Sequence, residues 1–184
     1  NGNGLTLSTP LWDRMAAKGS LENYEPKETA KALKQVIDEN PDTALTFATV
    51  HNFSTHTMLL RKWFEMGGID ADRDVRVIVL PPEQMVDSLA QGVIDGFCVG
   101  EPWNSIAVEY GAGVMASTGI KIWSGAPEKV LAVSEAWHVS NPGTHLRLRL
   151  ALMEACSWLS NMSNREEAIE ILSRPDYLDL SKEY

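Results

Sequence analysis

The segment from residue 44 to residue 68, ALTFATVHNFSTHTMLLRKWFEMGG, joins a short strand pattern to an amphipathic helix pattern. Residues 44–50 are mostly apolar or β-branched, whereas residues 54–66 carry apolar side chains at helical spacing and stop at Gly67-Gly68. The same alternation continues with a predicted strand at 75–80, a helix at 82–90, a strand at 94–99 and a helix at 102–110. Strands alternating with helices of this length predict a parallel sheet with right-handed crossovers.

The flanking sequence extends this pattern in both directions. Toward the N-terminus, it predicts a turn at Asn1–Gly4, a strand at 5–8, an amphipathic stretch at 10–18, a polar loop to Glu25 and a helix from Pro26 that stops before Asn40. Toward the C-terminus, it predicts short strands at 114–117 and 130–133 and helices at 145–159 and 165–173. The whole chain is therefore predicted to be an open α/β sandwich.

Composition excludes several classes of function. The chain has 184 residues, of which 44% are hydrophobic, and a formal net charge of -9. This acidic balance argues against a nucleic-acid surface, and it leaves an anionic ligand dependent on a local group of donors. Two distant cysteines, Cys98 and Cys156, predict no disulfide framework and leave the compartment undecided. No apolar run approaches the roughly 20 residues that a membrane-spanning helix needs.

The first candidate site is the end of the predicted strand at 44–50. Ligands of open α/β sheets collect at the carboxyl ends of strands, where helix N-termini expose N–H groups and a partial positive charge. Ser54 or Asn52 can cap the following helix, which leaves Thr55 and His56 in its first turn. The pattern also fits a plain helix cap with His56 at the surface, and both interpretations stay open.

The second candidate site is the turn at Gly100, where the strand at 94–99 ends. A residue without a side chain lets a ligand approach the backbone closely, although a tight strand-to-helix turn needs the same residue. Glu101 would repel an anion, so we expect its carboxylate to face away as a cap or in an ion pair. Cys98 and His56 could form a nucleophilic pair, but a cysteine within an apolar strand is usually inert.

Motifs of common enzymes and metal sites do not occur. The sequence contains no GxSxG, HExxH, P-loop or GxGxxG pattern, and no cysteine or carboxylate stands at metal-site spacing beside His51 and His56. We therefore expect neither catalysis nor a cofactor nor a metal.

Four long stretches resemble one family, the nitrate- and bicarbonate-binding receptors of ABC transporters, which are relatives of the sulfonate receptors. The stretches are Thr55–Trp63 with the turn Gly67–Asp70, then Pro81–Val86, Asp95–Asn104 and Pro127–Lys129. The resemblance implies a type II periplasmic-binding fold, in which two α/β lobes enclose the ligand. It further implies that residues 1–128 form the second lobe with a crossing strand and that residues 129–184 form the return crossing and C-terminal helices. Most of the first lobe is then absent from the sequence.

The resemblance also implies a set of anion contacts. His56 falls on the histidine that donates to the anion, Gly100 on a backbone contact and Lys129 on the cationic contact, with Thr55 beside His56. Asn3 lies where nitrate receptors place a glutamine. Bicarbonate-specific relatives replace the lysine with an acidic residue that works with calcium, so Lys129 favours nitrate or nitrite. A solvated lysine after a turn is the alternative for Lys129.

The resemblance implies a solute-binding component of an ABC-type nitrate or nitrite uptake system, facing the periplasm and working with a membrane permease. The alternatives are a cytoplasmic nitrate or nitrite sensor that holds an RNA-binding antiterminator, a receptor-like domain fused to a transporter ATPase, and a bicarbonate or sulfonate receptor. A thiamine-pyrimidine synthase of the same fold is more remote, because its cysteine- and histidine-rich iron motif is missing.

Overall fold

The computed structural model of the chain describes residues 2–19, 21, 25–126 and 128–180. Asn1, Pro127 and most of the predicted polar loop before Glu25 lie outside the described residues. The chain divides into two compact units, residues 1–128 and residues 129–184.

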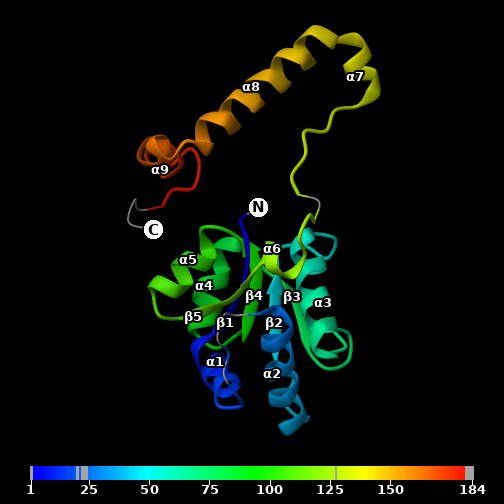
Figure 1. The fold of residues 1–184 in the computed structure, drawn as a ribbon, viewed down its shortest axis with the longest axis vertical. Helices are drawn as coiled ribbons and strands as arrows, with labels where there is room; N and C mark the ends of the chain where they lie inside the picture. Colours follow the sequence, from blue (N-terminus) through cyan, green and yellow to red (C-terminus); the bar gives the residue numbers. More distant parts are fainter. Residues whose placement is uncertain (1, 20, 22–24, 127, 181–184) are drawn as a thin grey trace. The chain divides into compact units, whose positions relative to one another are not determined.

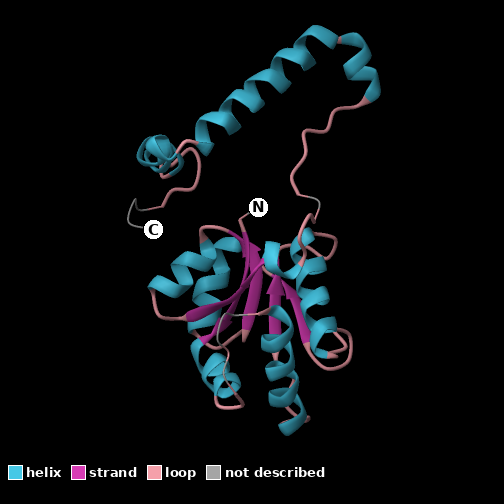
Figure 2. Cartoon of the chain, in the orientation of Figure 1, coloured by secondary structure: helices cyan, strands magenta, loops and turns pink. Residues whose placement is uncertain are grey.

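A five-stranded mixed sheet forms the centre of the first unit (Figure 2). The strands are β1 (Asn3–Ser8), β2 (Thr46–Thr49), β3 (Arg76–Val79), β4 (Gly96–Gly100) and β5 (Gly113–Thr118), in the order β3-β2-β4-β1-β5. Strand β2 pairs in parallel with β3 and β4, whereas β1 is antiparallel to both β4 and β5. The predicted α/β, parallel-rich sheet is confirmed, and β1 is the strand that runs against the others.

Helices cover both faces of this sheet (Figure 1). They are α1 (Thr9–Ala16), α2 (Pro26–Glu39), α3 (Thr55–Gly67), α4 (Pro82–Ala90), α5 (Trp103–Glu109) and α6 (Gly119–Ile122). Helices α1, α2, α3 and α6 share one face and its main apolar core, and α4 packs with α5 on the other.

Alternation along β1 decides which face each side chain meets. Leu5 and Leu7 are fully buried in the core beneath α1, α2 and α3. Thr6 points to the opposite face, where its hydroxyl donates to the Asn104 side chain of α5. Because side chains two residues apart share a face, Asn3 belongs with Leu5 and Leu7, on the side of the sheet that α3 covers.

Asn104 joins β1 and β4 to α5 through a fully buried amide. Its Oδ1 accepts from the Thr6 hydroxyl at 2.9 Å, and its Nδ2 donates to the Val99 carbonyl at 2.9 Å. Gly4 makes room for this side chain, since a Cβ there would lie 2.8 Å from Asn104 Cγ. The Asn104 amide thus holds together, from the face of the sheet that α5 covers, the two strands that carry Asn3 and Gly100.

Removing that amide is expected to weaken the fold measurably. Asn104→Ala leaves the Thr6 hydroxyl and the Val99 carbonyl buried without this partner, so the free energy of unfolding should fall by about 1–3 kcal/mol. Urea titration followed by circular dichroism measures the change. The exposed neighbour Ser105 supplies the control, because Ser105→Ala should alter stability by less than about 0.5 kcal/mol. Equal effects of the two substitutions would contradict this role of Asn104.

The second unit is helical and has no buried side chain among its described residues. It contains α7 (Glu135–Ser140), α8 (Pro142–Ser160), the 3-10 turn η2 (Met162–Asn164) and α9 (Arg165–Leu172). Leucines at 146, 148, 150 and 152 of α8 are all at least 40% exposed. Throughout the described residues, no helix is long and apolar enough to cross a membrane.

Two predicted elements need correction, and two helices were not predicted. Residues 130–133 form no strand, because their apolar pattern meets no neighbouring strand in the second unit. The predicted turn at Asn1–Gly4 is wrong for Asn3 and Gly4, which extend β1 by pairing with Gly100 and Val99. The helical pattern did not indicate the short helices α6 and α7. Ser134 caps α7 by accepting from the Trp137 N–H at 3.2 Å.

Candidate anion-binding site

The N-terminus of α3 is shaped by a network of hydroxyl groups at the end of β2. Ser54, rather than Asn52, is the cap: its Oγ accepts from the Thr57 N–H at 3.3 Å and donates to the His51 carbonyl at 2.7 Å. The Thr57 hydroxyl lies 2.7 Å from the same carbonyl oxygen. This network sets the orientation of the first turn, which carries Thr55 and His56, both half-buried.

Asn3 and Gly100 meet His56 at this end of the sheet, the upper end in Figure 1. Asn3 and Gly100 are directly paired across β1 and β4, and the Glu101 N–H donates to the Gly2 carbonyl at 2.7 Å just beyond them. His56 Nε2 lies 3.0 Å from Asn3 Oδ1. A Cβ built on Gly100 would lie 3.6 Å from Asn3 Oδ1 and 4.0 Å from His56 Nε2. The glycine therefore leaves space directly beside both polar groups.

Glu128 is the third polar side chain at this point, and sequence reasoning did not identify it. Its Oε1 accepts from Asn3 Nδ2 at 2.5 Å. A carboxylate only accepts, so the Asn3 amide nitrogen faces Glu128 and the amide oxygen faces His56. It follows that His56 Nε2 carries a proton and donates to Asn3. The three side chains form one chain of hydrogen bonds that runs from His56 through Asn3 to Glu128.

The chemistry of this group suits a small oxyanion. The imidazole N–H and the amide N–H are donors, and the N-terminus of α3 contributes a partial positive charge. Asn3 is only 3% exposed, so a hydrogen bond to it competes with little solvent. The Glu128 carboxylate and the Asn3 amide oxygen oppose an anion here.

Lys129 and Thr55 stay predictions as contacts. Lys129 is exposed and is the first residue of the second unit. Thr55 occupies the first position of α3, directly before His56. Of the five predicted residues, the structure brings Asn3, His56 and Gly100 together.

Two further predictions at this edge concern side chains that do not serve the site. Glu101 caps α5, because its Oε2 accepts from the Ser105 N–H at 3.1 Å, as expected for a carboxylate facing away. Burial, with a smaller contribution from the Glu128 charge, raises the pKa of the Cys98 thiol to about 12. Such a thiol stays protonated near neutral pH, which rules against the Cys98–His56 nucleophilic pair.

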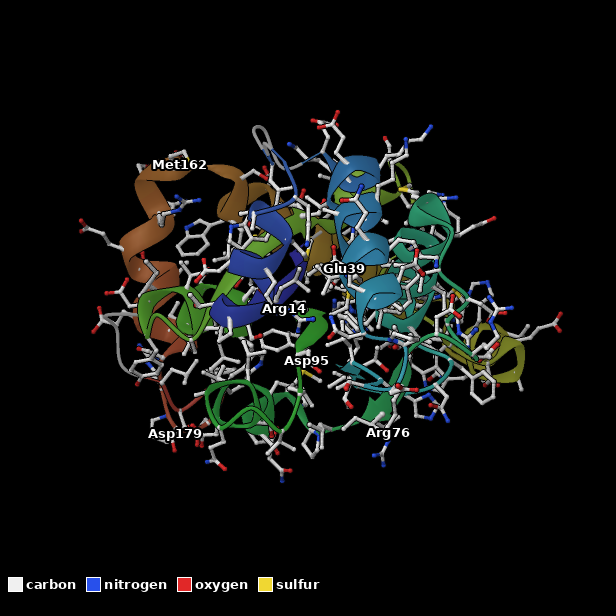
Figure 3. The ribbon with its side chains drawn as sticks, turned by 90° about the horizontal axis from the view of Figure 1, so that it is seen from below. Arg14, Glu39, Arg76, Asp95, Met162 and Asp179 are labelled. Atoms are coloured by element: carbon white, nitrogen blue, oxygen red, sulfur yellow. The ribbon has the colours of Figure 1, made fainter. Side chains whose placement is uncertain are left out.

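Other cavities lie elsewhere on the first unit, and two of them are lined in part by aspartate side chains. One of about 750 Å³ opens at the opposite end of the sheet, between Ser8, Asp13, Asp87 and Asp95, and its carboxylates disfavour an anion. Figure 3 views the molecule from that end and labels Asp95.

The second cavity, of about 690 Å³, includes Arg61 and Asp72. Two hydrogen bonds join these side chains, and they hold the pKa of the Asp72 carboxyl below its usual range. The Arg61 guanidinium is therefore already paired with the Asp72 carboxylate. Within the described part of the chain, no group of three or more His, Cys, Asp or Glu side chains could hold a metal ion.

Open α/β sheets bind ligands at strand ends, where the donor groups of this chain gather. The chain superposes on the crystal structure of the periplasmic nitrate-binding protein NrtA from Synechocystis PCC 6803 with a TM-score of 0.83 and 31% sequence identity, over 100% of this chain and 44% of that one. The sequence profile of the NMT1-like family matches residues 1–173, and the chain belongs to this family.

Curated relatives include subunits of anion importers. The chain is 42% identical over 184 residues to the nitrate import ATP-binding protein NrtC of Synechocystis sp., and 39% identical over 184 residues to the bicarbonate transport ATP-binding protein CmpC of Synechococcus elongatus. Each match covers 100% of this chain and 26% of the relative. The chain thus spans about a quarter of the length of these two relatives.

A methyl group at position 100 tests the site without disturbing the fold. It would make ordinary contacts with Asn3 and His56 while filling the space beside both, so Gly100→Ala should weaken nitrate binding at least about tenfold and leave the melting temperature nearly unchanged. Calorimetric titration of the natural full-length protein measures the affinity. Gly19→Ala, where a Cβ meets nothing within 4 Å, is the matched control. Nitrate affinity that survives Gly100→Ala would place the ligand elsewhere.

Proposed function

We propose that this chain binds nitrate or nitrite, without catalysis, as the receptor-type module of an ABC import system. The observation that carries the proposal is the meeting of Asn3, His56 and Gly100, which come from β1, α3 and β4 and lie more than 40 residues apart in sequence. Groups so distant in the chain gather at one point only because the fold brings them there. The family membership and the 31% identity to a nitrate-binding protein support the same ligand class.

Physical chemistry favours a few converging donors for such a ligand. Nitrate is planar, permanently ionised near neutral pH and a weak acceptor, so it needs several N–H groups and a nearby cation. A hydrogen bond to a charged group contributes roughly 1.5–3 kcal/mol net. Three or four such contacts, less the cost of association, reach about micromolar affinity.

Lys129 makes nitrate or nitrite our choice over hydrogen carbonate. Hydrogen carbonate carries a proton and benefits from an acceptor, which an ammonium group cannot supply. The relatives do not separate the two ligands by identity, since the nitrate and bicarbonate import subunits match this chain at 42% and 39%.

Two positions within the import system fit this module. A periplasmic receptor would deliver the anion to a permease after lobe closure. The 42% identity to an import ATP-binding protein favours the second solution, a receptor-like domain attached to the ATPase subunit. Because ATP is cytoplasmic, such a domain would sense the imported anion. Immunodetection in periplasmic and cytoplasmic fractions distinguishes these positions, and a cytoplasmic result also admits a sensor that holds an antiterminator.

The ligand assignment predicts losses of affinity at two positions. In the natural full-length protein, His56→Ala removes a donor and should weaken nitrate binding about 10- to 100-fold. Lys129→Glu replaces the cation with a repelling charge and should weaken it by at least as much. Isothermal titration with nitrate, nitrite and hydrogen carbonate measures both effects.

Matched controls share the chemistry of the two substitutions but lie away from the donors. His51→Ala removes an exposed imidazole from the loop that precedes α3, and Lys27→Glu makes the same charge change on the exposed surface of α2. Both should leave the nitrate affinity within about twofold of wild type. The assignment fails if His56→Ala and Lys129→Glu bind nitrate as tightly as these controls do.

A further inference from the structure

Glu128 is hydrogen-bonded into the group of donors, Asn3 and His56, that an anion would contact. Its carboxylate accepts from Asn3 Nδ2 at 2.5 Å, and the other end of the same amide accepts from His56 Nε2 at 3.0 Å. Both donors are therefore directed at protein acceptors.

A bound anion is incompatible with this arrangement. An oxygen of the ligand beside Gly100 would face the Asn3 amide oxygen and lie close to the Glu128 carboxylate, and both would repel it. For the two N–H groups to reach the ligand, His56 must leave Asn3 Oδ1, and Asn3 Nδ2 must leave Glu128. Water can replace these two hydrogen bonds only in part, because Asn3 is 3% exposed and Glu128 is half-buried.

We propose that the Glu128 carboxylate is an internal competitor, which occupies the anion's donors in the ligand-free protein and must be displaced before nitrate binds. The inference rests on the proposed function and adds a residue that sets the affinity of the same site. It fits the local chemistry, since a carboxylate and nitrate are both planar groups that present oxygens to N–H donors.

The size of the effect follows from the fraction of molecules whose donors are open. A tethered group competes at a constant effective concentration. The apparent affinity for the ligand is then the intrinsic affinity multiplied by the fraction of protein that is binding-competent. If the carboxylate is engaged in about nine molecules of ten, removing it should tighten nitrate binding about tenfold.

Two alternative roles of Glu128 predict changes of opposite sign in the nitrate affinity of its variants. A competitor predicts tighter nitrate binding in Glu128→Gln and Glu128→Ala. A positioning residue that holds Asn3 for the ligand predicts weaker binding in both. The alanine variant removes the side chain's acceptor altogether, whereas the glutamine variant removes its charge and keeps its shape.

Glu101→Gln is the matched control for net charge. Glu101 lies next to Gly100 and caps α5 through the Ser105 N–H, a role that glutamine can retain. If the loss of one negative charge near the site were sufficient, Glu101→Gln would tighten binding as much as Glu128→Gln does. The proposal expects the gain at Glu128 and less than a twofold change at Glu101.

The experiment titrates nitrate into the natural full-length protein and its three variants by calorimetry and follows the Asn3 side-chain amide by NMR without nitrate. About tenfold tighter binding in both Glu128 variants, with a shifted Asn3 amide resonance, supports the proposal. Unchanged or weaker binding in them, beside a wild type that binds nitrate, overturns the competitor and leaves the proposed function standing. If neither wild type nor any variant binds nitrate, the proposed function fails and this inference fails with it.

Discussion

The antiparallel pairing of β1 with β4 is the constraint on which the candidate site depends. It sets Asn3 opposite Gly100, and the alternation along β1 turns Asn3 toward the face covered by α3. A slip of one residue would send Asn3 to the face of α4 and α5, away from His56. The buried amide of Asn104 holds this register from the opposite face, through Thr6 of β1 and Val99 of β4. The asparagine of α5 thereby positions Asn3, a residue of the candidate site, in β1.

Local patterns predicted most of the first unit. Helix α4 was predicted with its observed bounds because Pro82 begins it, and α3 was predicted within one residue at each end because Ser54 and Gly68 mark its ends. Residues 130–133 show the limit of such patterns, since an apolar run becomes a strand only where another strand offers partners. The first residues of β1 show the reverse, because Asn3 and Gly4 are poor strand formers that pair nonetheless.

Local sequence patterns likewise identified some residues of the candidate site and missed others. A helix start after a buried strand was enough to nominate Thr55 and His56, and the strand-end glycine nominated Gly100. Asn3 and Lys129 came from family resemblance, as neither has a local signature. Glu128 was missed because its contact with Asn3 spans 125 positions, and no periodicity reports a pairing of that kind. Its carboxylate is hydrogen-bonded to Asn3, so an acidic side chain lies among the donors of the candidate anion site.

A crystal structure of the natural full-length protein grown with nitrate tests the central claim, that the ends of β1 and β4 and the start of α3 form one oxyanion site. The account predicts a planar ligand beside Gly100, with one oxygen about 2.7–3.2 Å from His56 Nε2 and the Glu128 carboxylate withdrawn from Asn3. Nitrate bound at another place, with the chain from His56 through Asn3 to Glu128 intact, would contradict it.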